Sequence, residues 1–120
     1  MQRTRAIPRR VGREALAWLA KAEAEWTRLE GHSDPERWRA AVDAFAYGYR
    51  YEVARCQWRL AEALLGVGDR TPATATARAA YQTAVQLRSE PLGQAIEALA
   101  RRGRLDLDDD APTERTLAGP

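Results

Sequence analysis

YEVARCQWRLAEALLGVGDRTPATATARAAYQTAVQLRSEPL, residues 51–92, is the stretch that decides the fold. It consists of two helix-favouring runs joined at Gly66-Val67-Gly68-Asp69, where the chain can reverse. Small residues recur where two helices must approach closely, and large apolar residues lie between them. These are Ala54, Ala61, Ala73, Ala77, Ala80 and Ala84, with Trp58, Leu60, Leu64 and Tyr81. The pattern predicts an antiparallel helical hairpin that stacks on other hairpins.

Apolar periodicity extends this prediction to the rest of the chain. We expect five helices, at about residues 12–30, 35–47, 50–65, 72–88 and 89–102. Ser33 is expected to cap the second helix, with Pro35 in its first turn, and Gly48 to end it in a left-handed conformation. No alternating β-branched run appears, so the predicted fold is all-α. Because the turns are short, successive helices should be antiparallel neighbours.

The chain of 120 residues is expected to form one domain, residues 12–107, between two charged ends. Residues 1–11 are arginine-rich and without acid, which predicts a basic flexible arm. Residues 108–120 lack helical periodicity and start with three aspartates, which predicts a disordered acidic tail. Leu105-Asp-Leu107, just before this tail, is expected to add an apolar contact to the domain.

Residue types that carry chemistry are sparse. Cys56 is the single cysteine, which excludes an internal disulfide and a cysteine-based zinc site and fits a reducing cytoplasm. His32 is the single histidine and lies in a turn, without ligand partners at metal-binding spacing. No phosphate-binding loop and no membrane-spanning apolar run of about 18 residues occur. We therefore expect a non-catalytic cytoplasmic protein that uses no cofactor or metal.

The aromatic and basic residues suggest an interaction surface. The candidate residues are Arg37, Tyr47, Tyr49, Arg50, Arg55 and Arg59. Two alternatives stay open. The arginines of the second and third helices either form a basic surface for phosphate or an acidic peptide, or pair with Glu36, Asp43, Glu52 and Glu62. The four tryptophans either pack between helices, since all lie on apolar stripes, or line a ligand groove. In the first helix that stripe comprises Val11, Ala15, Trp18, Ala22, Trp26 and Leu29.

Residues 54–87 span 34 residues, the period of a tetratricopeptide repeat. Hydrophobic, turn and small residues of that repeat have counterparts at Leu60, Leu64, Gly68-Asp69, Ala73 and Ala80. Ala61 stands where the repeat usually has glycine, and Ala77 where it has a bulky residue. The five helices are therefore expected to stack as a tetratricopeptide-like α-solenoid fragment.

A narrower resemblance rests on two segments, WRLAEALL at residues 58–65 followed by Gly68-Asp69-Arg70, and IEALARR at residues 96–102 followed by Leu105-Asp-Leu107. With AWLAKAEAEWTRLEG and SDPERWRAAVDAF, they resemble the helical region of large LuxR-family transcriptional regulators. In that family this region follows a signal-responsive ATPase and precedes a DNA-binding helix-turn-helix.

The resemblance implies an interaction or coupling segment that is truncated before the helix-turn-helix. Its partner would be a protein or the adjacent domains of a larger regulator, with DNA contacted only indirectly or weakly. The alternative is a small stand-alone scaffold that binds DNA or protein through its arginine-rich N-terminal arm. Exposed ends of stacked repeats also predict self-association into homo-oligomers.

Overall fold

The computed structural model describes residues 2–108 of the chain, with side chains from Gly12 onward. Within that range the secondary structure is helical, without strands. The helices are α1 (Gln2–Leu29), α2 (Pro35–Phe45), α3 (Arg50–Gly66), α4 (Arg70–Gln86) and α5 (Glu90–Gly103). The predicted all-α fold with five helices is therefore confirmed.

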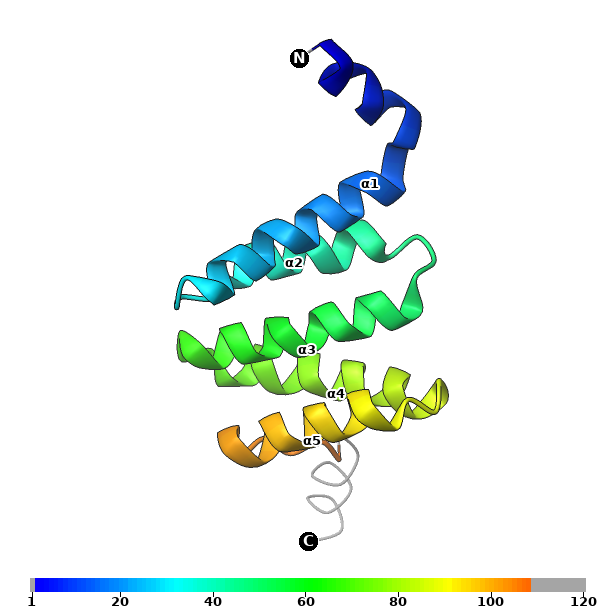
Figure 1. Ribbon diagram of the computed structural model, residues 1–120. Coiled ribbons are helices and arrows are strands. Elements are labelled where there is room, and N and C mark those ends of the chain that lie inside the picture. Colours follow the sequence, from blue (N-terminus) through cyan, green and yellow to red (C-terminus); the bar gives the residue numbers. More distant parts are fainter. Residues whose placement is uncertain (1, 109–120) are drawn as a thin grey trace, which may run out of the picture.

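The helices form a stack of antiparallel neighbours (Figure 1). Each helix contacts the next one along the chain, most extensively α3 with α4, and α3 also contacts α5. In Figure 1, α1, α3 and α5 lie toward the viewer, with α2 and α4 behind them. The short turns explain this order, because they leave successive helices no other place to pack.

The two ends of the chain differ from the rest of the stack. The segment expected to be a flexible arm has helical backbone from Gln2, and Gly12 breaks the helix with φ 55° and ψ −137°. The flexibility of this segment stays a prediction. At the other end, Leu105 is buried against α5 and Leu107 packs beside it, as the sequence predicted. The expected acidic tail lies outside the described residues apart from Asp108.

The start of α2 differs by one residue from the sequence prediction. Asp34 is the cap, since its carboxylate accepts a hydrogen bond from the backbone N–H of Glu36 at 2.9 Å. The Ser33 hydroxyl instead accepts a hydrogen bond from the indole N–H of Trp38 at 2.8 Å. Ser33 thus holds the buried Trp38 in place, and the neighbouring Asp34 caps the helix.

Four helices end in the same way. In each, a backbone N–H two or three residues past the helix donates to the carbonyl five residues earlier, and the residue just before that N–H is left-handed. The left-handed residues are Gly31, Gly68, Arg88 and Arg104. The prediction that Gly48 ends α2 in this way was wrong. The Tyr49 N–H bonds to the Phe45 carbonyl at 3.1 Å, a helix-like step that needs no left-handed residue.

Arg88 is expected to be a poor residue for its position. Its φ of 55° costs a side chain with a Cβ roughly 1 kcal/mol, a cost that glycine avoids. We expect Arg88→Gly to raise the free energy of unfolding by up to about 1 kcal/mol, and Gly68→Ala, at φ 88°, to lower it by a similar amount. Urea denaturation followed by circular dichroism measures both changes. Equal effects of the same sign would contradict this account of the two turns.

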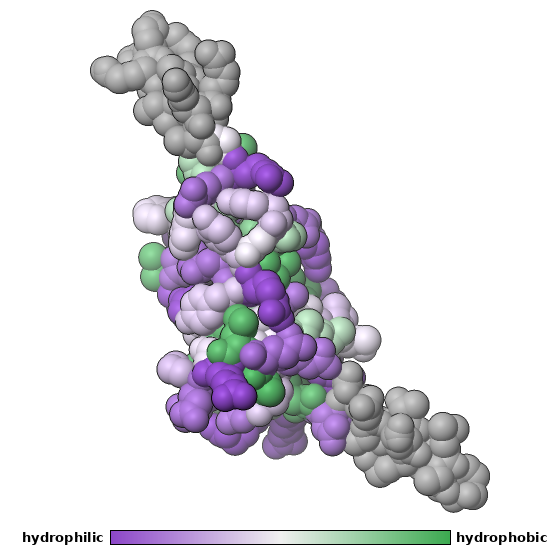
Figure 2. Space-filling model, turned by 90° about the vertical axis from the view of Figure 1, so that its right-hand side faces the viewer, coloured by the Kyte–Doolittle hydropathy of each residue, from purple (hydrophilic) through white to green (hydrophobic). Residues whose placement is uncertain are grey.

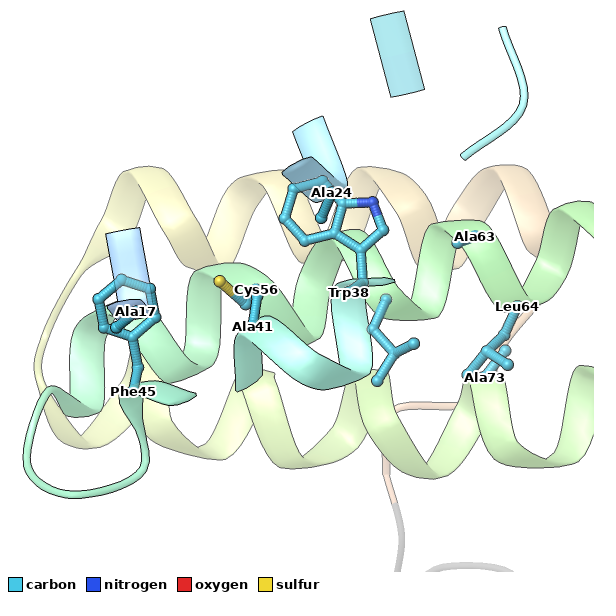
Figure 3. Close-up of a cluster of buried hydrophobic side chains, with 10 residues drawn as sticks. Ala17, Ala24, Trp38, Ala41, Phe45, Cys56, Ala63, Leu64 and Ala73 are labelled. Atoms are coloured by element: carbon cyan, nitrogen blue, oxygen red, sulfur yellow. The ribbon is translucent and has the colours of Figure 1, made fainter. Parts of the chain in front are cut away.

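The core has two parts. The first lies between α1, α2 and α3, and Trp38, Phe45 and Cys56 are its largest fully buried side chains (Figure 3). The second joins α3, α4 and α5 around Ile96, Leu92 and Leu99. The alanines predicted to lie between helices are all buried: Ala54, Ala61, Ala73, Ala77, Ala80 and Ala84. Their small size explains the extensive contact between α3 and α4.

The apolar stripe of α1 does not face the core. Trp26 is 62% exposed and Trp18 43% exposed, whereas Ala17 and Ala24 on the opposite side are fully buried. Of the two alternatives predicted for the tryptophans, packing between helices therefore holds for Trp38, whereas Trp26 is mostly exposed and Trp18 is half-exposed with one edge contact to Phe45 of α2. Small residues can approach α2 more closely than indole rings, and the rotation of α1 follows from that contact.

Candidate interaction groove

The structure distributes the six candidate surface residues over three places. Arg37 lies on α2 and pairs with Glu23 of α1 at 3.2 Å. Tyr47, Tyr49 and Arg50 lie at the α2–α3 turn. Two residues of α3, Arg55 and Arg59, face α1. They are the only two of the six candidates that line the same groove among the described residues.

The tyrosines at the α2–α3 turn hold this turn to α1. Tyr49 stacks on Phe45 with ring centroids 5.7 Å apart, and its hydroxyl donates a hydrogen bond to Glu14 at 3.0 Å. That bond to a carboxylate raises the pKa of Tyr49 to about 12. Arg13 lies over the Tyr47 ring at 4.4 Å. These contacts occupy the aromatic faces, so the turn has a structural role.

A groove of about 420 Å³ runs between α1 and α3. Its lining residues are Trp18, Lys21, Ala22, Glu25 and Arg28 from α1, with Arg55 and Arg59 from α3. The α1 residues recur at three- and four-residue steps and the two arginines of α3 are four apart, so each set follows one side of its helix. The groove is therefore built on rigid elements that are held side by side.

Most charges around the groove are paired. Lys21 bonds to Glu52 of α3 at 2.7 Å, and Arg59 bonds to Glu62 at 2.9 Å. Glu25 accepts a hydrogen bond from Arg28, which holds the pKa of that carboxyl below its usual value. On α2, Arg39 pairs with Glu36, which agrees with the predicted alternative that the arginines pair with neighbouring carboxylates.

Arg55 differs from these residues. Within residues 12–108 the structure gives it no carboxylate partner, and its Nε is buried without a hydrogen bond. Its guanidinium lies 5.9 Å from the ring centroid of Trp58, and that of Arg59 lies 4.0 Å from the same ring. The indole N–H of Trp58 is also buried without a partner. The wall formed by α3 thus carries an unpaired cation.

The groove has an excess of positive charge, because its lining holds four cationic side chains and one carboxylate. Carboxylates and phosphates are the groups that guanidinium binds best, through paired hydrogen bonds. Three of the α1 residues, Lys21, Glu25 and Arg28, were not among the candidates from the sequence, whereas Trp18 was considered there as one of four tryptophans that could line a groove. Their three- and four-residue spacing was visible there, but only the packing of α1 on α3 shows that they face the two arginines.

Other hollows offer fewer free groups. One of about 450 Å³ lies between α4 and α5 beside Tyr81 and Glu97. The Tyr81 hydroxyl donates a hydrogen bond to Glu97 at 2.6 Å, which raises the pKa of Tyr81. Figure 2 shows the side of the stack that carries the α2–α3 and α4–α5 turns, where apolar side chains form only small patches among polar ones. The α1–α3 groove is therefore the better candidate.

Cys56 is fully buried, and this burial raises the pKa of its thiol to about 12. His32 is exposed in the α1–α2 turn, as predicted. No group of three or more potential metal ligands occurs in the part of the chain that the structure describes. A helix long and apolar enough to cross a membrane is likewise not found among the described residues.

The buried thiol makes stability depend on alkaline pH. Above about pH 9 the thiol of the unfolded chain ionises, whereas the folded thiol keeps its proton, so the unfolded state gains stability. We expect the free energy of unfolding to fall by about 1 kcal/mol between pH 8 and pH 10 relative to Cys56→Ala. Urea denaturation at several pH values measures this difference. A parallel pH dependence of the two proteins would contradict it.

Comparison with known proteins does not assign the chain to a family. No protein-family model matches the chain, and no curated protein or solved structure is significantly similar to it. The resemblance to tetratricopeptide repeats and to LuxR-family regulators therefore stays a prediction.

Proposed function

We propose that this chain is a non-catalytic interaction segment, built from tetratricopeptide-like helical hairpins and related to the helical region of LuxR-type transcriptional regulators. It binds an acidic segment of a partner protein or of an adjacent regulator domain in the α1–α3 groove. The free thiol of Cys56 supports a place in the reducing cytoplasm.

The observation that carries this proposal is the unpaired guanidinium of Arg55. A partly desolvated cation without a partner is unfavourable, and a carboxylate that entered the groove would remove that cost. Arg59 lies one helical turn away and would contact the same segment. Trp18 supplies apolar surface for the carbon chain of that segment.

Coupling follows from the position of the groove. Its walls belong to two hairpins, so a bound segment links α1 to α3 and opposes any movement between them. In a larger regulator this would transmit binding as a change in the packing of neighbouring helices. DNA binding through the arginine-rich residues 1–11 remains the alternative.

A library of decapeptides that differ in net charge tests the proposal. We expect acidic peptides to bind preferentially, with an affinity that falls as salt rises. Arg55→Gln should weaken binding at least about tenfold, since a hydrogen bond between charged groups contributes roughly 1.5–3 kcal/mol. Arg39→Gln is the matched control, because Arg39 lies on α2 and is already paired. Binding that ignores peptide charge, or equal effects of the two variants, would contradict the proposal.

A further inference from the structure

The outer side of α1 is apolar and mostly uncovered. We call it the outer stripe, defined as Ala15, Trp18, Leu19, Ala22, Trp26 and Leu29. At 100° per residue these six residues lie within an arc of about 100°, opposite the buried Ala17 and Ala24. An apolar arc of this width is typical of a helix side that is covered by another element.

Most of the outer stripe is not covered by a described helix; Trp18 alone has a ring contact, edge-on to Phe45 of α2 with ring centroids 5.0 Å apart. In Figure 1, α1 forms the upper end of the stack, and only its own N-terminal continuation lies beyond it. Leu19 is 54% exposed and Leu29 65% exposed, similar to Trp26. Between residues 15 and 29 no charged side chain falls within the arc. The stripe itself therefore carries no charged group, and the nearest cation, Lys21, lies at its edge 5.0 Å from the Trp18 ring centroid.

The exposed area is compatible with a dimer. Two half-exposed tryptophans and two half-exposed leucines present on the order of 500 Å². Two such surfaces placed face to face would bury about 1,000 Å², the lower limit for a specific interface, whereas stable interfaces usually bury about 1,200–2,000 Å². Residues beside the stripe, such as the half-exposed Leu16, would add to this area.

The order of residue sizes along the stripe is self-complementary. If two α1 helices cross antiparallel at Ala22, Trp18 of one lies opposite Trp26 of the other, and Ala15 lies opposite Leu29. The small residue at the crossing point lets the helices approach, and Leu29 of each copy meets Ala15 of the other, while Leu19 lies opposite Glu25. Such pairing of one patch with itself is what a two-fold interface requires.

We propose that the outer stripe is the docking surface for a second copy of this chain, with the two α1 helices antiparallel about a two-fold axis at Ala22. The stripe shares Trp18 and Ala22 with the lining of the α1–α3 groove, so a dimer and a segment bound in the groove would use the same two residues. Dimer formation itself is measured below without any peptide, so its outcome does not depend on what the groove binds.

Sedimentation velocity over a range of concentrations tests this interface. We expect a dimer whose dissociation constant rises at least about tenfold in Leu19→Glu, since a charge would have to be buried. Leu19 is exposed in the single chain, so the helical content of this variant by circular dichroism should stay unchanged. Val85→Glu is the matched control, an apolar residue of α4 that is 58% exposed and should leave the dimer intact.

Cross-linking tests the axis. Ala22→Cys should form an interchain disulfide under mild oxidation, because the two residues at position 22 meet at the axis. The wild type, whose Cys56 is buried, and Val85→Cys should remain uncross-linked. A protein that stays monomeric at about 100 µM would overturn the proposal. So would a dimer that Leu19→Glu does not weaken, or one without a cross-link at position 22.

Discussion

Trp38→Ala is expected to lower the free energy of unfolding by about 3–5 kcal/mol. Trp38 is 1% exposed and lies in the core between α1, α2 and α3 (Figure 3). Its removal leaves a large cavity and also frees the Ser33 hydroxyl that its indole N–H contacts. Domains of this size have total stabilities of roughly 5–15 kcal/mol, so much of the protein would be unfolded at moderate temperature.

Urea denaturation followed by the helical circular dichroism signal measures this loss. Val85→Ala is the control, because Val85 is largely exposed and such substitutions change stability by about 0.5 kcal/mol or less. If Trp38→Ala shifted the midpoint no more than the control, the α1–α2–α3 cluster would not be the main source of stability.

The number, type and order of the helices could be predicted because the signals are local. Apolar spacing, the Gly66–Asp69 turn and Pro35 each act within a few residues. Helix starts were less certain, and α4 begins at Arg70, two residues before the expected Pro72. The cap of α2 could not be predicted because Ser33 and Asp34 are both good caps. The structure decides between them, since the Ser33 hydroxyl accepts a hydrogen bond from the Trp38 indole and Asp34 is left to cap the helix.

The rotation of α1 could not be predicted because this helix is apolar on two sides. One side carries Ala17 and Ala24, and the other carries the larger residues of the outer stripe. Periodicity identifies both sides, and the larger residues dominated the prediction. The structure shows that close approach to α2 selects the alanine side. A sequence pattern reports which residues share a side, but the neighbour determines which side is buried.

The candidate site could be predicted only in part. The arginines of α3 were identified from their type and spacing, and they do line the groove. Arg37 was grouped with them on the assumption that α2 faces α3 through this side, but it points to Glu23 of α1 instead. Ion-pair partners on different helices depend on helix rotation, and for this reason Glu52 pairs with Lys21 rather than with an arginine.

The alanines between α3 and α4 provide the second large effect. We expect Ala77→Leu to lower the free energy of unfolding by about 1–3 kcal/mol, because Ala77 is fully buried in the cluster that also contains Ala61. The added carbons have no space unless α3 and α4 move apart. Leucine favours helix nearly as strongly as alanine, so the loss would come from packing. For a domain of this size it corresponds to a melting temperature lower by about 5–20 °C.

Ala75→Leu is the matched control, since Ala75 is exposed two residues earlier on the same helix. Thermal unfolding by circular dichroism should show almost no shift for this variant, and equal shifts for the two would mean that α3 and α4 do not depend on small residues. The Ala77→Leu substitution should also affect binding in the α1–α3 groove. Because Arg55 and Arg59 are carried by α3, a displacement of α3 in Ala77→Leu should weaken acidic-peptide binding even at temperatures where the variant is fully folded.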